Sequence, residues 1–335
     1  MNKKHHAFTL IVVLASMLFI TLFASGAPVQ EISEHEFQVS PDDQLIVSVR
    51  DADIKIEGET GRNSVSIVIT KTLKNVDEDK AQDIFDLYAF DCTQEDGLVR
   101  IESLPFDKSV YRQLKNYFKG LNIKIEVMVP EKSAILAKTS DGDISLSTIA
   151  GKVDLKTSDG DVSVGDITGP VNASTSDGDI SLRQITGEVE IKTSDGDLSI
   201  TDVDGNVQAK TSDGNVTVTN LTGNLDAKTS DGNIQASGVS GSLDLKTSDG
   251  NIDARLTQTP PSDCNLITSD GSISLSVTDD VSADLKIRVS DGDISFSHPS
   301  AQISKLNKHS VSARINEGGV MINLITSDGN IDVSN

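Results

Sequence analysis

The sequence predicts an all-β protein: a right-handed parallel β-solenoid (β-helix) of 18-residue coils, with one or two covering helices near its N-terminus. Two observations predict this fold. The triplet Ser-Asp-Gly occurs ten times, and its first seven copies, from Ser140 to Ser248, are spaced 18 residues apart. Between the triplets, apolar and polar residues alternate. A short fixed period of this kind is typical of units that bury their apolar side only by stacking on their neighbours.

One repeat, residues 157–174, shows how a coil is built. It divides into two nine-residue halves, each a short strand followed by a turn that contains glycine. Val162 and Val164 alternate with polar residues in the first half, which is the period of two expected for a strand with one buried face. A second apolar pair alternates in the other half, and Ile167 precedes the second turn. We therefore expect about five inward side chains per coil, aligned in ladders along the stack.

An antiparallel meander is the competing architecture, because Asp-Gly between alternating segments is also a strong hairpin signal. A meander would place every inward position on one face of a single sheet and leave that face bare. The repeats contain no helical segment that could cover it. A coil that closes on itself buries its own apolar side, so the solenoid is favoured. Crossover connections between parallel strands are right-handed as a rule, so we expect the solenoid to wind in the right-handed direction.

The chain is predicted to have three parts. Residues 1–27 have the composition of a secretory signal peptide, with Lys3 and Lys4 before an apolar run and small residues after it. A retained membrane anchor is the alternative, although the apolar run is shorter than the roughly 20 residues of a membrane span. Residues 28–130 are expected to form degenerate first coils with helical insertions, and residues 131–335 the regular repeats. The signal peptide predicts an exported protein that is periplasmic, at the cell surface or secreted.

Two segments of the second part have helical spacing. In residues 75–90, Ala81, Ile84 and Phe85 recur at helical intervals, and acidic residues precede them where they suit the positive end of the helix dipole. Residues 106–121 are basic and aromatic in an otherwise acidic chain. They predict either a second covering helix or a contact site for an anionic surface. The candidate partner-binding residues are Lys108, Tyr111, Arg112, Lys115, Tyr117 and Lys119.

The chain contains 29 basic and 51 acidic residues, a formal net charge of −22. Such a charge disfavours nucleic acid as a partner, because binding of the phosphate backbone needs clustered lysine and arginine side chains. Cys92 and Cys264 are the two cysteines. An exported protein can pair them in a disulfide, and two unpaired thiols are the alternative.

Equivalent residues of stacked coils lie about 4.8 Å apart, so the triplet aspartates should form a file along one rim. Like charges at that spacing repel by roughly 1 kcal/mol per pair in water. Calcium bridging would relieve the repulsion, although calcium-binding rolls use a turn richer in glycine. Alternatively, each aspartate accepts hydrogen bonds within its own turn, and a file of nearby lysines offsets its charge. The candidate metal-binding residues are Asp141, Asp159, Asp177, Asp195, Asp213, Asp231 and Asp249.

We expect no enzyme, and no cofactor other than calcium. Beyond the signal segment, His35, His298 and His309 are scattered without the spacing of metal ligands or of a catalytic triad. A polysaccharide-active β-helix would need locally distinctive acids, for example in a cleft formed by the insertions at residues 257–319. The triplet aspartates instead recur in every coil.

The repeat spacing lengthens towards the C-terminus, to 21, 21 and finally 37 residues. We expect the last interval to hold two coils, one without a triplet. The chain stops on a predicted strand, residues 330–333, with no closing element. This C-terminal coil would leave an open edge, through which a partner or a second copy of the chain could associate end to end.

The sequence also resembles a known family. Residues 125–130 (Ile-Glu-Val-Met-Val-Pro), followed by serial Thr-Ser-Asp-Gly units, resemble the bacterial adhesin-like family, a domain of unknown function built from β-strand repeats. The resemblance covers residues 37–335 and implies an exported, non-enzymatic β-helix. It would serve as a binding or structural scaffold at the cell envelope, with a protein or glycan of that envelope as its ligand. The family defines no functional residues that could be transferred. A calcium-binding structural module is the alternative function, followed by the polysaccharide-active enzyme.

Overall fold

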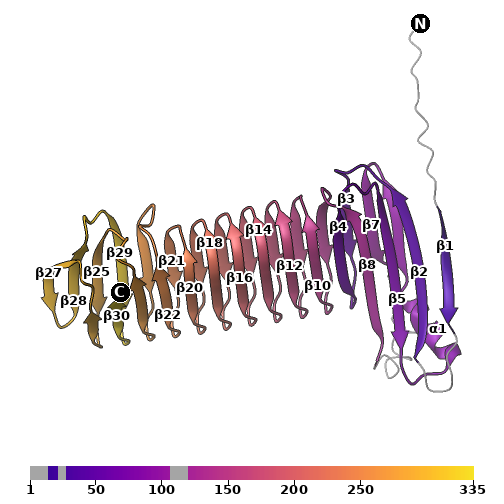
Figure 1. Ribbon diagram of the computed structural model, residues 1–335. Coiled ribbons are helices and arrows are strands. Elements are labelled where there is room, and N and C mark those ends of the chain that lie inside the picture. Colours follow the sequence, from indigo (N-terminus) through magenta and orange to yellow (C-terminus); the bar gives the residue numbers. More distant parts are fainter. Residues whose placement is uncertain (1–13, 22–27, 106–119) are drawn as a thin grey trace, which may run out of the picture.

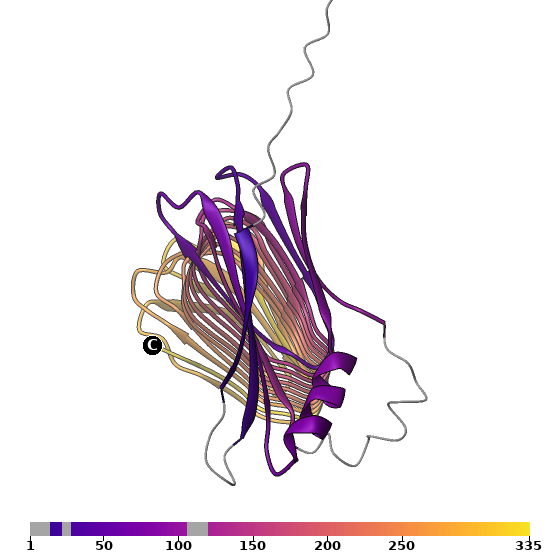
Figure 2. The ribbon, with the colours of Figure 1, turned by 90° about the vertical axis from the view of Figure 1, so that its right-hand side faces the viewer.

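The computed structural model describes residues 14–21, 28–105 and 120–335, whose regular secondary structure is β-strand apart from one α-helix (Figure 1). The strands form two sheets of 15 strands each. Sheet A contains β10 (Ile144–Ile149), and sheet B contains β11 (Val153–Lys156). The view along the stack in Figure 2 shows the two sheets facing each other. In the middle of the molecule the chain alternates between them, so one strand from each sheet makes one coil.

The middle of the molecule is a regular stack. In sheet A it contains β10, β12 (Val162–Thr168), β14 (Ile180–Thr186), β16 (Leu198–Asp204), β18 (Val216–Thr222), β20 (Ile234–Val239), β22 (Ile252–Leu256) and β24 (Ile273–Val277). In sheet B it contains β9 (Ala134–Lys138), β11, β13 (Val171–Ser174), β15 (Val189–Lys192), β17 (Val207–Lys210), β19 (Leu225–Lys228), β21 (Leu243–Lys246) and β23 (Cys264–Ile267). Neighbouring strands are parallel, with Ile144 opposite Val162. This pairing excludes the antiparallel meander here.

Aliphatic ladders fill the space between the two sheets. Val162, Val164 and Ile167 point inward from sheet A, and Val171 and Ala173 point inward from sheet B; each is at most 4% exposed. The equivalent residues of the neighbouring coils are buried in the same continuous core. Burial of these stacked side chains is the main term that stabilises the solenoid, because a single coil cannot enclose its own apolar face.

A left-handed residue in the sheet-A strands allows the third inward side chain. Val164 and Ile167 are three residues apart, and plain alternation would point them to opposite faces. Asp166 lies between them with φ of 58°, and this local kink returns Ile167 to the inward face. The equivalent residues of other coils share the conformation: Thr148, Gln184, Asp202, Asn220 and Gly238.

The Thr-Ser-Asp-Gly turns join each coil to the preceding one. The buried Thr193 hydroxyl donates to the carbonyl oxygen of Gly178 in the preceding coil at 3.0 Å and accepts the N–H of Gly196 at 3.3 Å. A Cβ atom on Gly196 would lie 1.9 Å from the Gly178 oxygen. Glycine is therefore required in this turn because the backbones approach so closely.

The N-terminal end departs from simple stacking. Its elements are β1 (Leu14–Thr21), β2 (Val29–Gln38), β3 (Gln44–Ser48), β4 (Asp53–Glu59), β5 (Ser64–Leu73), α1 (Glu78–Leu87), β6 (Phe90–Glu95), β7 (Leu98–Ser103) and β8 (Asn122–Pro130). The coil β3–β4 pairs in parallel with β9–β10 on one side and with β7–β8 on the other. The coil β7–β8, which comes later in the chain, thus lies nearer the N-terminal end of the stack than the coil β3–β4. Beyond it, β5, β2 and β1 extend sheet A, and β6 extends sheet B.

Helix α1 lies within residues 75–90, where helical spacing predicted it. Ala81, Ile84 and Phe85 are buried and pack with Leu73 at the end of β5. Of the second candidate helix, positions 106–119 lie outside the described residues. No helix in the described part of the chain is long and apolar enough to cross a membrane.

Strand β1 lies inside the predicted signal peptide. It pairs antiparallel with β2, with Phe19 opposite Ile32. Residues 1–13 and 22–27 of the same segment lie outside the described residues. The signal peptide itself stays a prediction.

At the C-terminal end, too, the order of the coils in the stack differs from their order in the chain. The elements of this end are β25 (Ala283–Val289), β26 (Ile294–Phe296), β27 (Ala301–Asn307), β28 (Ser310–Ile315), β29 (Val320–Thr326) and β30 (Ile331–Ser334). The final coil, β29–β30, lies between β23–β24 and β25–β26. The expectation that the C-terminal coil leaves an open edge is therefore wrong, because β30 is paired on both sides. An antiparallel hairpin, β27–β28, stands where an extra coil was expected.

Candidate functional site

The seven triplet aspartates lie at the turns between sheet B and sheet A, and all are exposed. They are Asp141, Asp159, Asp177, Asp195, Asp213, Asp231 and Asp249. The hydrogen bonds expected of them are made by the residue two positions later: Asp179 Oδ1 accepts the backbone N–H of Asp197 in the next coil at 2.7 Å, and Asn233 Oδ1 accepts that of Asn251 at 2.8 Å. The side chains that stabilise these turns are thus the buried threonines and a second file, which is formed by the residue two positions after each triplet aspartate.

Within the described residues, no group of three or more His, Cys, Asp or Glu side chains is arranged to hold a metal ion. The triplet aspartates project from the rim one per coil, and calcium prefers six to eight oxygen ligands. Calcium binding by this file stays a prediction.

The remaining candidates from the sequence are the six residues of the basic, aromatic segment and the two cysteines. Lys108, Tyr111, Arg112, Lys115, Tyr117 and Lys119 all fall outside the described residues. Both cysteines are unpaired: Cys92 is half-buried in β6, and Cys264 is buried in β23. Burial and the neighbouring Asp91 raise the pKa of Cys92 to about 12, and burial raises the pKa of Cys264. Both thiols are therefore poor nucleophiles at neutral pH.

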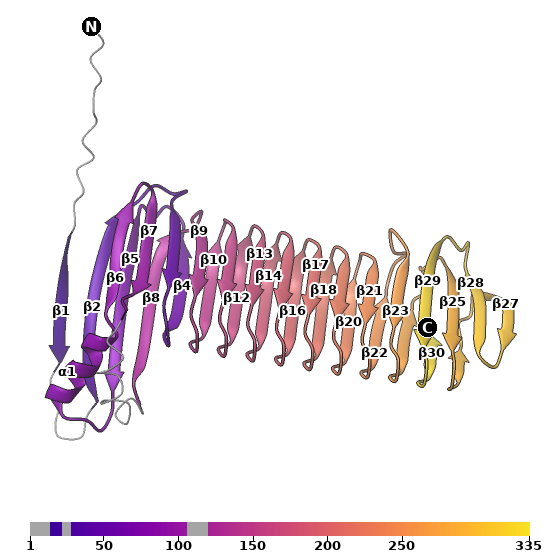
Figure 3. The same cartoon turned by 180° about the vertical axis from the view of Figure 1, so that it is seen from behind.

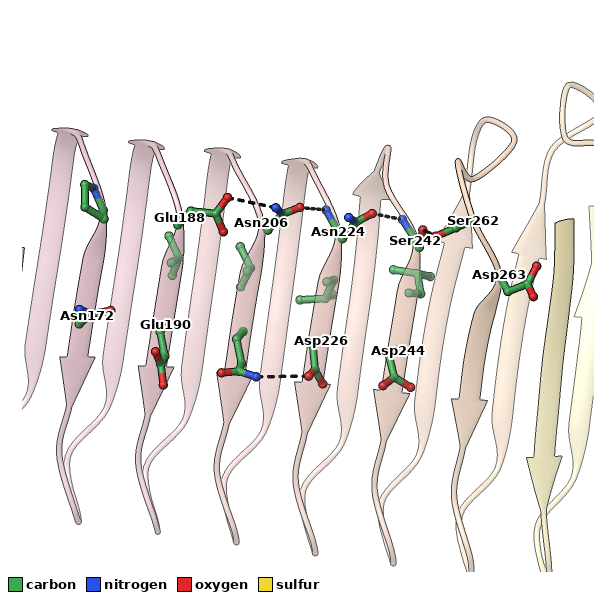
Figure 4. A pocket seen from close by; sticks show the side chains of 16 residues that line it. Asn172, Glu188, Glu190, Asn206, Asn224, Asp226, Ser242, Asp244, Ser262 and Asp263 are labelled. Carbon is green, nitrogen blue, oxygen red and sulfur yellow. Dashed lines mark hydrogen bonds between the residues drawn. The ribbon is translucent and has the colours of Figure 1, made fainter.

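A groove lined mostly by polar side chains lies on the outer face of sheet B (Figure 4). Its volume is about 510 Å³, and it crosses five successive strands, from β13 to β21. At one end the loop that carries Ser262 and Asp263 forms its wall. The groove therefore follows the axis of the stack rather than entering the core.

Two files of outward side chains line the groove. The upper file is Glu188, Asn206, Asn224 and Ser242, and the lower file is Asn172, Glu190, Gln208, Asp226 and Asp244. Residues of the two files are two positions apart in each strand, with an inward apolar residue between them, so alternation places both files on one face. Parallel in-register pairing then repeats each file every about 4.8 Å.

Hydrogen bonds between coils hold the upper file in place. Asn206 Nδ2 donates to Glu188 Oε1 at 3.1 Å, and Asn206 Oδ1 accepts the N–H of Asn224 at 3.0 Å. Asn224 Oδ1 in turn accepts the N–H of Ser242 at 2.9 Å, and the Ser242 and Ser262 hydroxyls are in contact. These bonds fix the side-chain rotamers, so the groove is preorganised.

The lower file contains three of the five acids that line the groove, Glu190, Asp226 and Asp244. Lys228 Nζ lies 2.7 Å from Asp226 Oδ1, and Lys246 Nζ lies 3.0 Å from Asp244 Oδ1. These lysines thus pair with sheet-B aspartates and do not offset the triplet file as expected. Although desolvation raises it, hydrogen bonds from Lys228 and Gln208 hold the pKa of Asp226 below its usual value. The sixteen residues that line the groove include five acids and no Lys or Arg.

The sequence matches the Toastrack family, DUF4097, over residues 43–239 and 222–334. The chain belongs to this family. The predicted resemblance to an adhesin-like domain of unknown function is thereby confirmed. None of the curated proteins matches the sequence.

Three solved structures have low similarity to this Toastrack protein. A candidate lipid binding protein from Parabacteroides distasonis is 14% identical, with a TM-score of 0.38, over 92% of this chain and 97% of that one. A candidate adhesin from the same organism is 10% identical, with a TM-score of 0.33, over 90% and 96%. A candidate cell adhesion protein from Clostridium sporogenes is 11% identical, with a TM-score of 0.22, over 90% and 99%. We draw no functional conclusion from similarities this low.

A second cavity lies in the C-terminal insertions of this Toastrack protein, where the enzyme alternative required a cleft with distinctive acids. Its lining contains one acid, Asp284, whose Oδ1 accepts a hydrogen bond from Arg314 Nε at 2.8 Å. Bonds from Arg314 and from the N–H of Gly319 lower the pKa of Asp284. A glycosidase needs two acids, one with a raised pKa. This cavity therefore lends no support to the enzyme alternative.

The groove was missed from the sequence, although a signal was present. The triplet turns are the most regular feature of the sequence, and the candidate metal-binding residues lie there rather than in the groove. The groove side chains stand in the three-residue segments that follow the second turn, Glu-Val-Glu at residues 188–190, Asn-Val-Gln at 206–208, Asn-Leu-Asp at 224–226 and Ser-Leu-Asp at 242–244. Each segment presents two hydrogen-bonding side chains on one face, whereas the equivalent Lys-Val-Asp of an earlier coil begins with a base.

Proposed function

We propose that this Toastrack protein is a non-catalytic, adhesin-like binding scaffold of the cell envelope, and that the groove on sheet B is its binding surface. The observation that carries the proposal is the pair of polar files repeated in register over successive coils. A site built this way presents two hydrogen-bonding side chains in each of four successive coils. It suits a ligand that is itself an extended repeat.

The chemistry of the lining favours a linear glycan that is neutral or positively charged. Asn206, Asn224 and Gln208 supply amides that both donate and accept, which suits hydroxyl and acetamido groups. Ion pairs with lysines neutralise Asp226 and Asp244, and the other three lining acids form no ion pair within the described residues, so the groove keeps a negative charge that repels a polyanion and attracts amino groups. Each contact is weak, and contacts repeated along one chain add because the later ones form at high effective concentration.

The predicted signal peptide supports a place at the envelope. The apolar run with preceding lysines at residues 1–27 has the composition of a secretory signal, and an adhesin-like scaffold acts where it meets surface polymers. The signal peptide, and the choice among periplasm, cell surface and secretion, are part of the proposal.

Calorimetric titration with three hexasaccharides tests the proposal. We expect binding of the glucosamine hexamer, weaker binding of the N-acetylglucosamine hexamer, and none of the galacturonic acid hexamer. Gln208→Ala in the groove should weaken binding at least several-fold, whereas Gln235→Ala, on the exposed face of sheet A, should leave it unchanged. Preference for the galacturonic acid hexamer, equal effects of the two substitutions, or no binding of any hexamer would contradict the groove as a glycan site.

A further inference from the structure

The two sheets end at different levels at the C-terminal end of the stack. Sheet A stops at β26, which pairs with β30. Sheet B continues past β25 with two more strands, β28 and then β27. Figure 3 shows β28 and β27 as the outermost strands at this end. Within the described residues, the outer edge of β27 pairs with no other strand.

This overhanging hairpin leaves apolar side chains uncovered. Ile303 lies opposite Ala313, and Leu306 lies opposite Val311. Ala313 and Val311 are buried in the core, so their cross-strand partners share the inward face. A register shift between Ile303 and Lys305 explains why inward residues three apart face the same way. Ile303 is nevertheless 49% exposed and Leu306 70% exposed, so the core-lining face extends beyond the coils that cover it.

The other end of sheet B has a matching edge. Its last strand is β6, whose outer edge also pairs with no strand in the described part of the chain. Phe90 and Cys92 of β6 are half-buried and pack against the core. The alternate residues Asp91, Thr93 and Glu95 are exposed on the outer face. An added strand with an apolar inner side would continue the core here.

The two edges have opposite charge. Residues 301–315, which form β27 and β28, contain Lys305, Lys308 and Arg314 and no acid. Residues 90–103, which form β6 and β7, contain four acids and one base. A basic hairpin is unusual in a chain with a formal net charge of −22. It would attract the acidic end of a second copy, where acids outnumber bases four to one.

We propose that β27 of one copy adds to β6 of the next, so that sheet B runs continuously from copy to copy. The strand directions allow this joint. Strand β27 runs in the same direction as β25, because β28 is antiparallel to both. Strand β6 runs in the opposite direction to the main strands of sheet B, because it is antiparallel to β7, which is parallel to β3. Two copies aligned head to tail therefore bring β27 and β6 together as an antiparallel pair. A joint between two different surfaces that repeats along the axis of the stack, without a rotation that closes a ring, builds an open chain of solenoids.

The side-chain pattern specifies a register for the joint. Facing residues of an antiparallel pair lie on the same side of the sheet. A register with Leu306 beside Phe90 joins the two apolar inner faces, and it also brings Lys305 beside Asp91 on the outer face. The joint thus buries the exposed leucine and pairs opposite charges at the same time.

Sedimentation velocity over a range of protein concentrations tests the joint. We expect species larger than the monomer that grow with concentration and diminish at high salt. Leu306→Ser and Lys305→Glu should each weaken association at least tenfold without lowering the melting temperature, because both residues are exposed. Lys286→Glu is the matched control: Lys286 is exposed on β25 but away from the edge, and its reversal should change little.

A charge exchange identifies the partner edge. Asp91→Lys alone should also abolish association, and Asp91→Lys combined with Lys305→Glu in one chain should restore it. An equimolar mixture of the two single variants should recover the long species, with the variants alternating along the chain, because every joint between unlike variants pairs a base with an acid, whereas each variant alone pairs like charges. A monomer at every concentration, association insensitive to Leu306→Ser, or failure of the double variant to recover would overturn the proposal.

Discussion

The middle of the solenoid and its two ends are built by different rules. In the middle, each coil stacks on the coil that precedes it in the chain, as with Val162 opposite Ile180. At the ends, β7–β8 lies outside β3–β4, and β29–β30 lies inside β25–β26. These changes of order occur where insertions separate the strands. A short turn can reach only the adjacent level of the stack, whereas a long insertion lets the chain pass a neighbouring coil.

The largest expected effect concerns a buried ion pair at the N-terminal end. Lys71 Nζ lies 2.7 Å from Glu31 Oε1 and donates to the carbonyl oxygen of Phe85 at 2.9 Å. Lys71→Met leaves the buried Glu31 carboxylate without its charged partner and with only the Gln82 amide donating to it at 3.1 Å, so it should lower the free energy of unfolding by about 3–5 kcal/mol. Guanidinium unfolding measures the loss. The double variant Lys71→Met, Glu31→Leu should recover most of it; a double variant as unstable as the single one would show that the ends are not held by this pair.

The close approach of the turn backbones in the middle gives the next largest effect. Gly196→Ala would place a Cβ atom 1.9 Å from the Gly178 oxygen, so the two coils must move apart. We expect a loss of about 3 kcal/mol, the upper range for overpacking. Gly165→Ala is the control, because the nearest atoms to its Cβ lie 3.8 Å away. Equal unfolding midpoints for the two variants would mean that coil spacing does not depend on this glycine.

Removing a buried threonine hydroxyl from one of the Thr-Ser-Asp-Gly turns should lower the free energy of unfolding by less. Thr193→Val removes the hydroxyl that accepts the N–H of Gly196 and donates to the carbonyl oxygen of Gly178. Leaving these buried groups without partners should cost about 1–3 kcal/mol. Thr217→Val, on the outer face of β18, should leave the unfolding midpoint almost unchanged. A comparable loss in both variants would argue that the turn threonines act only through strand propensity.

Calcium gives the smallest expected effect. The triplet aspartates are exposed, and the turns are already joined by the second file and by threonine. We expect the melting temperature in millimolar calcium to equal that in excess chelator. A rise of several degrees, abolished by Asp195→Asn together with Asp213→Asn, would revive the calcium-binding alternative.

The regular part of the fold was predictable because each inward position has an unambiguous residue. Val162, Val164 and Ile167 recur as aliphatic residues at an interval that only a stack can bury. The reason for the turn glycine was not predictable, because the Asp-Gly signal suggests a backbone angle, whereas the structure shows close contact between successive coils. Contacts between coils cannot be read from one repeat.

The ends were less predictable for a physical reason. Residues 45–56 match the pattern of a regular coil, which predicted that the stack begins early, and β3–β4 does pair in parallel with β9–β10. The residue pattern of a strand, however, does not indicate which of two possible coils it pairs with when a long insertion precedes it. Shape complementarity between coils decides this, and it depends on side chains that are distant in sequence. The groove was missed similarly, because its files form only after the coils are in register.

Nuclear magnetic resonance of the isotope-labelled protein during titration with the glucosamine hexamer tests the central claim most directly. If the repeated polar files of sheet B bind the glycan, the amide signals that shift will belong to β13–β21 of that sheet and to the loop at Ser262 and Asp263. Signals of the triplet turns and of sheet A will stay in place. Shifts concentrated at the triplet turns or in the C-terminal insertions, with the groove unaffected, would contradict the account.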